Sequence, residues 1–449
     1  MGTGPLIEPR TLKGFRDYLP GLMIPREHLL ETARVAFRRY GFLPIDTPAL
    51  EYAEILLGKG GDESDKLVYR FTDHEGRDVA LRFDLTVPFA RFAAQHAGKL
   101  GTPFKRYAMG PVWRGENTGH GRYREFWQCD FDTIGTVSVA SDAETLLVIH
   151  DLLASLGVGG FVIRLNHRQV LNGLLEKLGL AARSVEVLRA LDKLPKVGRD
   201  AVVAEMGTTA GASPGQAGSI LDMAGMEGDT STILDRLTVE LAASERGLEG
   251  VARLRQVLEV AWAAGVPKER VKLDLSIARG LDYYTGLIFE SFLEALPGIG
   301  SVCSGGRYDD LAGLYTRQAL PGVGASLGVD RLLAALEELG LLTGKRNTAG
   351  MMVLQFEAGH LGECYALARS LHAAGLEAEV SPEARKLGAQ LQQAEKRGCR
   401  LVAFAGPDER VKGLWKLKDL ARREEFLVPT GEVAAQAMAI LASPVVVAG

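Results

Sequence analysis

The chain has 449 residues, of which 47% are hydrophobic and 24% charged, proportions typical of a folded globular protein with room for about three domains. Its 52 Lys and Arg residues and 56 Asp and Glu residues leave a net charge of -4. This balance excludes a uniformly basic nucleic-acid-binding surface, although a local basic patch stays possible.

Four cysteines without a CxxC spacing argue against a disulfide scaffold or a zinc finger and favour a reducing compartment. The N-terminal segment lacks a basic stretch followed by an apolar one, so the sequence predicts no signal peptide. No apolar run approaches the length of about 18 residues that a transmembrane helix needs. We therefore predict a cytoplasmic protein with no membrane association.

The first predicted elements combine helices with antiparallel strands. Residues 26–40 carry apolar side chains at helical spacing, and Gly41 is typical of a helix end. The β-rich runs 67–71 and 79–85 flank turn residues and predict a hairpin. A second strand pair is predicted at 104–114 and 123–135, and a helix at 141–156.

Residues 166–260 are predicted to be mostly helical, with a flexible Gly- and Ala-rich stretch at 207–218. We interpret this region as a helical insertion. Strand character returns at 271–280 and 287–292. A glycine-rich run at 322–328 follows, then a helix from about residue 330.

From residue 350 onwards, strands and helices alternate, which predicts a small α/β domain of about a hundred residues. The predicted strands are 351–356, 376–381 and 401–406, and the predicted helices are 361–374, 386–398 and 431–442. Residues 344–347 are the predicted linker. The expected domains are a first domain in two parts, 1–165 and 261–343, the insertion at 166–260, and a last domain at 349–449.

The segment 105–135 concentrates the residues suited to chemistry. Side chains two apart on a strand share a face, and here that face carries anion-binding and hydrogen-bonding groups. Arginine forks suit phosphate or carboxylate, and an aromatic ring can stack on a base. The alternative is a solvated ribbon with cross-strand ion pairs. The residues predicted to share this face are Arg114, Glu116, Arg122, Arg124, Phe126, Gln128, Asp130 and Asp132.

This hairpin resembles motif 2 of the class II aminoacyl-tRNA synthetases, in the version of the histidyl-tRNA synthetase family. Further segments match that family in order, over nearly the whole chain. They are GFRDYLP (14–20), YGFLPIDTPALE (40–51), LRFDLTVPFAR (81–91), ARGLDYYTGLIFE (278–290), GVGASLGVDRL (322–332) and RKLGAQLQQAEKRG (385–398). Segment 278–290 is the one that separates histidine from other class II substrates.

The resemblance implies a mixed α/β (α+β) fold: an antiparallel sheet flanked by helices, a helical insertion and a C-terminal anticodon-binding domain. It implies that ATP, with magnesium, activates L-histidine, and that the histidyl group passes to the 3′ end of tRNA(His). Segment 40–51 resembles motif 1, which implies a homodimer. The sequence does not identify the magnesium ligands, and no histidine has metal-ligand spacing.

The resemblance also implies roles for single residues. Arg114 and Arg279 would be catalytic, with Arg279 on the α-phosphate. The family often has Glu where Asp84 and Asp132 stand, and both forms keep the carboxylate. The implied histidine-binding residues are Asp84, Thr86, Arg114, Gln128, Asp132, Arg279, Tyr283, Tyr284 and Tyr308. The implied ATP-binding residues are Arg114, Glu116, Arg122, Phe126 and Arg331.

The expected RNA contacts rest on charge. Residues 385–423 hold eleven Lys and Arg against four Asp and Glu, a patch suited to phosphate. Trp415 is either a platform for an unpaired base or a core residue. The loop 117–121 departs from the basic-Pro-Gln stretch with which relatives reach the tRNA acceptor end, so the way in which this chain reads that end stays open.

The main alternative is a non-catalytic regulatory or tRNA-sensing paralogue. Such proteins typically lack the anticodon-binding domain and lose active-site residues, whereas residues 349–449, Arg114, Arg279 and Arg331 are present here. An amino-acid ligase that does not use tRNA is kept open by the loop 117–121. A different amino-acid specificity is opposed by the segment 278–290.

Overall fold

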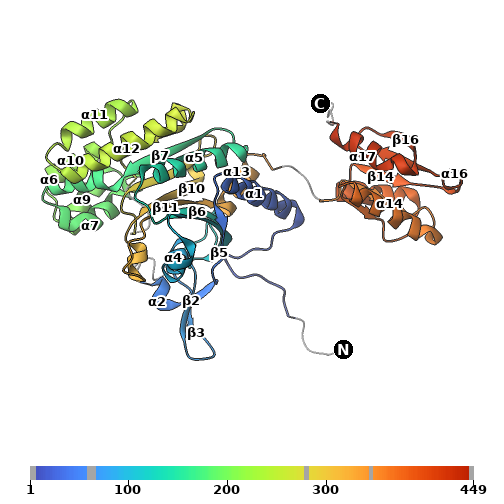
Figure 1. Ribbon diagram of the computed structural model, residues 1–449, viewed down its shortest axis with the longest axis horizontal. Helices are drawn as coiled ribbons and strands as arrows, with labels where there is room; N and C mark the ends of the chain where they lie inside the picture. Colours follow the sequence, from blue (N-terminus) through green and yellow to red (C-terminus); the bar gives the residue numbers. More distant parts are fainter. Residues whose placement is uncertain (1–6, 58–66, 278–282, 343–346, 444–449) are drawn as a thin grey trace. The chain divides into compact units, whose positions relative to one another are not determined.

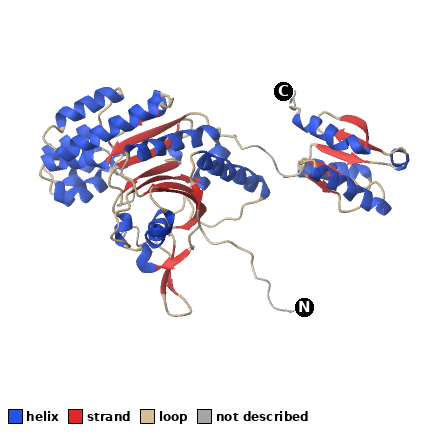
Figure 2. Ribbon diagram, in the orientation of Figure 1, coloured by secondary structure: helices blue, strands red, loops and turns tan. Residues whose placement is uncertain are grey.

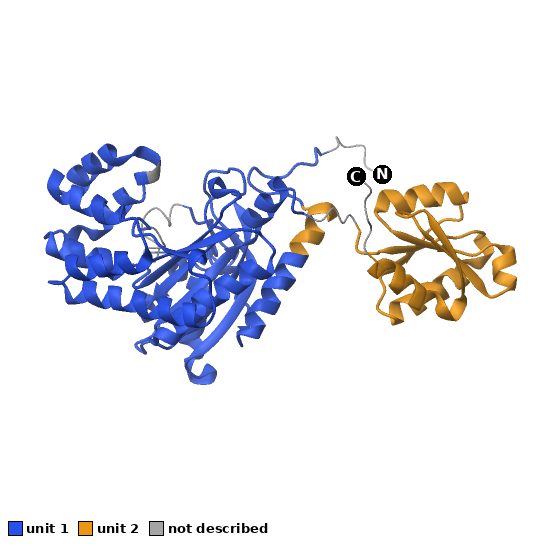
Figure 3. Cartoon of the chain, turned by 90° about the horizontal axis from the view of Figure 1, so that it is seen from above, with its two compact units in different colours: residues 1–17, 28–342 blue, residues 18–27, 343–449 orange. Residues whose placement is uncertain are grey.

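The computed structural model describes residues 7–57, 67–277, 283–342 and 347–443 (Figure 1). The chain forms two compact units (Figure 3). One consists of residues 1–17 and 28–342, and the other of residues 18–27 and 343–449. Across these described ranges, no helix is both long enough and apolar enough to cross a bilayer.

The first unit is built on a sheet with the strand order β1-β5-β6-β11-β10-β9-β7-β8 (Figure 2). The six inner strands pair antiparallel, and the edge strands β1 and β8 pair in parallel with their neighbours. The strands are β1 (Leu43–Pro44), β5 (Phe104–Trp113), β6 (Glu125–Ile134), β7 (Phe161–His167), β8 (Val271–Leu273), β9 (Leu287–Leu293), β10 (Cys303–Tyr308) and β11 (Gly322–Gly328).

Helices α1 (Pro20–Arg39) and α5 (Val139–Ser155) cover one face of this sheet. Phe37 of α1 packs on Phe131 of β6, with the ring centroids 5.1 Å apart. Asp142 of α5 pairs on the same side with Arg307 of β10. Further elements of this unit are α2 (Ala53–Leu56), β2 (Leu50–Tyr52), β3 (Arg70–Thr72), β4 (Asp78–Leu81), α4 (Thr86–Leu100) and α13 (Val329–Glu338). The predicted hairpin is present as β3 and β4, and α4 packs at one end of the opposite face through Val87 and Phe89.

Residues 168–263 form a helical region, as predicted (Figure 1). The helices are α6 (Arg168–Lys177), α7 (Ser184–Leu191), α8 (Leu194–Val197), α9 (Arg199–Ala210), α10 (Pro214–Ala224), α11 (Thr230–Glu240) and α12 (Glu245–Ala263). The prediction of a flexible stretch at 207–218 was wrong. Gly211 ends α9 with a left-handed backbone, and Ser213 and Gln216 begin α10 with a reciprocal capping box. Gly211 and Ser213 are therefore helix caps, and most other residues of this stretch lie inside α9 or α10.

The second unit contains a sheet of strand order β13-β12-β14-β15-β16. Its first three strands pair in parallel and its last two pair antiparallel. The strands are β12 (Met351–Val353), β13 (Ala378–Val380), β14 (Leu401–Phe404), β15 (Leu414–Asp419) and β16 (Glu424–Pro429), and the helices are α14 (Leu361–Ala373), α15 (Leu387–Arg397), α16 (Pro407–Val411) and α17 (Val433–Ala442).

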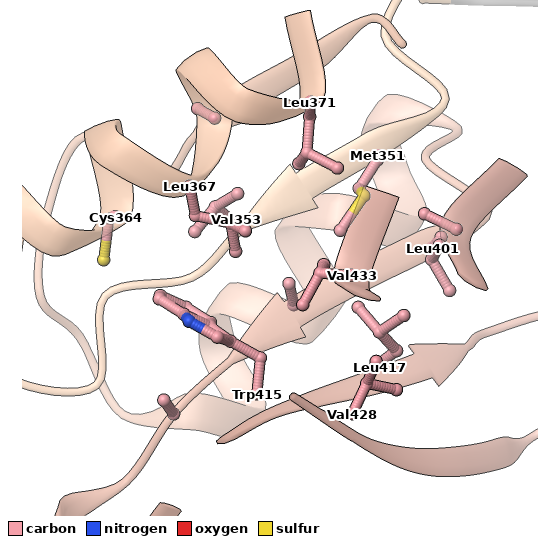
Figure 4. Packing of buried hydrophobic residues seen from close by; sticks show 14 of the residues in the cluster. Met351, Val353, Cys364, Leu367, Leu371, Leu401, Trp415, Leu417, Val428 and Val433 are labelled. Carbon is pink, nitrogen blue, oxygen red and sulfur yellow. The ribbon is translucent and has the colours of Figure 1, made fainter. Parts of the chain in front are cut away.

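Strand β15 decides between the two predicted roles of Trp415, a base-stacking platform or a core residue, in favour of the core. The side chain is 6% exposed and packs in the core beside Val353, Leu367 and Val433 (Figure 4). Lys416 and Lys418 alternate with it, and they pair with Glu409 and Glu425. Because alternate residues of a strand face opposite sides, Trp415 and the two lysines lie on opposite faces of β15.

Candidate active site

Polar side chains line one face of β6. Gln128, Asp130 and Asp132 face away from α1, whereas Phe131 packs against it. Each of the three polar residues is buried, and Phe126 belongs to the same alternation. The structure thus has the alternation that the sequence predicts, on the sheet face opposite α1.

Asp132 is the centre of a buried triad. Arg106 Nη2 lies 2.7 Å from Asp132 Oδ2, and the Tyr308 hydroxyl donates to Asp132 Oδ1 over 2.5 Å. Burial raises the pKa of Asp132, while Arg106 and Tyr308 oppose that rise. Burial also raises the pKa of Tyr308 well above its ordinary value, so this phenol stays a hydrogen-bond donor. The triad holds a carboxylate in one orientation.

Glycines on the neighbouring strands give these side chains their space. Gly324 is the register partner of Asp132, and a Cβ at this glycine would overlap the Asp132 carboxyl. A Cβ at Gly322 would overlap the Tyr308 ring. Both glycines belong to the glycine-rich run 322–328. The structure shows that two of its glycines make room for Asp132 and Tyr308.

Asp84 lies where the segment after β4 enters α4. Its Oδ1 accepts a hydrogen bond of 3.0 Å from the backbone N–H of Val87, and its Oδ2 accepts one of 3.2 Å from Tyr283. Burial raises the pKa of Asp84. Tyr283 also interacts with Thr86, and its ring lies next to those of Tyr284 and Tyr308 at centroid distances of 5.1 and 6.0 Å. The structure therefore brings Asp84, Thr86 and the three tyrosines together.

Arg114 lies just beyond the end of β5. Its Nε donates to the Phe83 carbonyl over 2.9 Å, and its guanidinium carbon lies 5.1 Å from the centroid of the Phe126 ring. This cation–π contact and the backbone bond orient the guanidinium group. Arg114 is therefore positioned by both the segment before α4 and β6.

Four residues predicted on strands lie instead in the connection between β5 and β6. The strands end at Trp113 and resume at Glu125, so Arg114, Glu116, Arg122 and Arg124 are loop residues. The backbone here bonds partly to other segments, since the N–H of Gly115 donates to the Leu67 carbonyl over 2.7 Å and that of Arg124 to the Gly14 carbonyl over 2.8 Å. Within the connection, Arg122 pairs with Glu116.

Two family models match this chain. The family model described as "Histidyl-tRNA synthetase" matches residues 14–332, and the model described as "Anticodon binding domain" matches residues 349–438. This chain belongs to the histidyl-tRNA synthetase family.

Individual relatives agree with that assignment. A curated protein of Rhodopirellula baltica named "Histidine--tRNA ligase" is 55% identical, over 93% of this chain and 95% of its own. A crystal structure of histidyl-tRNA synthetase from Nostoc sp. PCC 7120 superimposes with a TM-score of 0.88 at 34% identity, covering 97% of this chain and all of that one. The predicted family and the predicted mixed α/β (α+β) fold are both confirmed.

A second solved structure shares the fold alone. It is titled an ATP phosphoribosyltransferase regulatory subunit/histidyl-tRNA synthetase, from Bacillus halodurans, and matches with a TM-score of 0.74 at 23% identity. It covers 87% of this chain and 97% of its own.

Two further residues carry assignments from the family resemblance. Arg331 is in the first turn of α13, directly after β11, and donates to the Ser301 carbonyl over 2.6 Å. Arg279, predicted as catalytic, lies outside the described residues, as do the other residues from 278 to 282.

Sequence reasoning missed Arg106, the cation that pairs with the buried Asp132 carboxylate. Arg106 is the largest fully buried side chain, and its guanidinium also donates to the Leu85 carbonyl over 3.0 Å. The available signal was one arginine among the alternating apolar residues of β5.

The protein residues were tested as a metal cage. In the parts of the chain that the structure describes, no three His, Cys, Asp or Glu side chains are arranged to hold a metal ion. Magnesium that arrives on ATP phosphates needs only one or two protein carboxylates.

Proposed function

We propose that this chain is a histidine–tRNA ligase, which activates L-histidine with ATP and transfers the histidyl group to the 3′ end of tRNA(His). The observation that carries the proposal is one sheet face on which Asp84, Asp132, Tyr308 and Arg114 converge. The named relative at 55% identity supports the same activity.

The first chemical step is attack of the histidine carboxylate on the α-phosphorus of ATP, which expels pyrophosphate. Negative charge grows on the equatorial oxygens, and a fixed guanidinium stabilises it. Arg114 is suited to this role because Phe83 and Phe126 already orient it. We assign Arg279 the same role from the family resemblance alone.

We assign recognition of histidine to the buried polar groups. Asp84, Thr86 and Gln128 supply acceptors for the α-ammonium group. Asp132 and Tyr284 would hydrogen-bond the imidazole nitrogens, with Tyr283 and Tyr308 shaping the pocket. A side chain that left the buried Asp132 carboxylate unpaired would be rejected.

We assign ATP binding to Glu116, Arg122, Phe126 and Arg331 together with Arg114. Phe126 would stack on adenine, with Glu116 on the same side. The Arg122–Glu116 ion pair implies that Arg122 exchanges a carboxylate for phosphate when ATP binds. Magnesium would neutralise phosphate charge.

The remaining assignments follow from the same family. We propose a catalytic domain in two parts, 1–165 and 261–343, interrupted by the insertion 166–260, and an anticodon-binding domain at 349–449. We further propose a homodimer formed through segment 40–51 and a cytoplasmic location.

The direct test is ATP–pyrophosphate exchange with each proteinogenic amino acid in turn, followed by charging of tRNA(His). Exchange with histidine alone is the expected result. The contrary outcome is a folded protein that binds histidine but catalyses no pyrophosphate exchange with any amino acid. That result would favour a regulatory paralogue, a class that the name of the Bacillus halodurans structure includes.

Arg279→Ala tests the role taken from the resemblance. Adenylate formation should slow by orders of magnitude with an unchanged unfolding transition, because the transition-state charge loses a guanidinium. Arg255→Ala, in an exposed pair with Asp235, is the matched control. Equal rates for the two variants would remove Arg279 from the mechanism.

A further inference from the structure

Asp130 lies between two proposed histidine-binding residues, Gln128 and Asp132, and the proposed function gives it no role. It is 1% exposed and points to the same side of β6 as its neighbours. Its register partners are Ser326 on β11 and Ala108 on β5. A buried carboxyl group at this place needs a physical explanation.

Several buried polar atoms on this face lack hydrogen-bond partners at normal distance among the described residues. On β6 and β11 they include Asp130 Oδ1, Gln128 Oε1 and Ser326 Oγ, and on β5 they include Nε and Nη1 of Arg106. The Ser326 hydroxyl still lies close enough to Asp130 to oppose the rise of its pKa. Buried polar atoms in folded proteins are nearly always paired. While Asp130 is ionised, Asp130 Oδ1 and Gln128 Oε1 can only accept hydrogen bonds. A donor is therefore needed to satisfy them.

The arginines near Asp130 make their shortest contacts with other groups. Arg106 Nη2 lies 4.0 Å from Asp130 Oδ2 but 2.7 Å from Asp132 Oδ2. Arg82 donates to the carbonyls of Thr47 and Pro111. Asp130 is therefore a buried carboxyl group without a cation of its own at short range.

We propose that Asp130 is a specificity-determining residue that recognises a cationic N–H group of the bound amino acid. The inference rests on the proposed function, because it assumes that histidine occupies this face. Below about pH 7, Asp130 is protonated in the empty pocket, and it is ionised in the complex. When it binds an N–H group that is already cationic in solution, its own O–H bond breaks, the proton passes to solvent, and the ligand's N–H donates to the carboxylate.

The electrostatic surroundings agree with this exchange. Burial raises the pKa of Asp130 to about 7, with Arg106 opposing the rise and Asp132 adding to it. Binding that requires the ionised form must strengthen as the pH rises through this value and must release a proton below it. The charged and titratable groups that act on this site are Arg82, Asp84, Arg106, Arg114, Asp132, Tyr284 and Cys303.

Calorimetric titration in buffers of different ionisation enthalpy counts the protons released. The wild-type protein should bind L-histidine at about pH 6 with release of close to one proton more than Asp130→Asn. At about pH 8 the variant should bind about tenfold more weakly or worse, and the difference should shrink at about pH 6. Asn is isosteric with the neutral carboxyl group, so the unfolding transition should be kept.

A histidine analogue with a triazole ring separates the two cationic groups, because that ring takes up no proton near neutral pH. If the protein still releases a proton on binding this analogue, the group that Asp130 recognises is the α-ammonium group. If the proton release disappears, that group is the imidazolium. Asp235→Asn, on an exposed side chain of α11, is the control.

Equal proton release by wild type and Asp130→Asn would overturn the proposal. No release by the wild-type protein with either ligand would overturn it even if the variant failed to fold. Failure of the wild-type protein to bind histidine at all would instead overturn the proposed function.

Discussion

At the scale of single residues, two neighbours in β6 face opposite environments. Phe131 packs with Phe37 in the core between α1 and the sheet, while Asp132 points into the candidate pocket. Burying a carboxylate is costly unless it is paired, and Arg106 and Tyr308 supply that pairing. The position of Asp132 therefore depends on side chains from three strands.

Gly324→Ala tests the space that the pocket needs. The new Cβ would overlap the Asp132 carboxyl, so we expect the KM for histidine to rise at least about tenfold in pyrophosphate exchange. Gly328→Ala on the same strand is the control, because its Cβ would meet its nearest atom at an ordinary 3.7 Å. Similar KM values for the two variants would contradict the role given to Gly324.

Tyr308→Phe removes one hydrogen bond from Asp132. A bond to a charged group is worth about 1.5–3 kcal/mol, so histidine binding should weaken about tenfold or more in equilibrium titration. Tyr315→Phe is the control, because the Tyr315 hydroxyl donates to a backbone carbonyl, that of Ile55, over 2.7 Å. Loss of affinity in both variants alike would indicate a general packing defect.

At the scale of elements, a buried carboxylate joins the helical insertion to the sheet. Asp142 of α5 accepts from Arg253 Nε of α12 over 2.6 Å and from Arg307 Nε of β10 over 2.8 Å. Arg307 also contacts Asp309, which bonds the Thr285 hydroxyl over 2.8 Å. This chain of polar contacts leads from the insertion to the segment that carries Tyr283 and Tyr284.

Asp142→Ala should destabilise the first unit by about 3–5 kcal/mol, because two guanidinium groups lose the carboxylate between them. Chemical denaturation measures this change. Asp235→Ala breaks an exposed pair with Arg255 and should cost no more than about 1 kcal/mol. A loss in Asp142→Ala as small as that of the control would mean that the two arginines find other partners.

At the scale of the whole molecule, each unit has a hydrophobic core of its own. Phe83, Phe89 and Leu311 belong to a core of the first unit, and Val353, Leu367 and Trp415 to a core of the second. Separate cores allow one unit to fold without the other. This arrangement lets the proposed chemistry and the proposed RNA recognition be tested apart.

Removal of residues 349–449 should therefore reduce tRNA charging at least about tenfold more than it reduces pyrophosphate exchange. The physical reason is that the proposed adenylation residues all belong to the first unit, whereas anticodon recognition is assigned to the second. Both rates are measured on the same preparation, with its unfolding transition as the folding control. Equal loss of both rates would contradict the division of labour.

The sequence by itself determined the elements whose signal is local. Alternation along 126–132 predicted the polar face of β6, and helical spacing predicted α1 and α15. Ordered motifs over nearly the whole chain indicated the family. These features could be predicted because strand alternation, helical periodicity and the motifs are patterns within short segments of the sequence.

Only the tertiary structure decided which residues meet. Arg106 and Asp132 lie on neighbouring strands, and Asp84 reaches Tyr283 across 199 positions of sequence. No local pattern identifies the core residues that bury Trp415. Nor does one identify the Gly14 carbonyl, which accepts a hydrogen bond from the N–H of Arg124. The burial and the hydrogen bonds of these residues depend on segments that are distant in sequence and come together only in the folded chain.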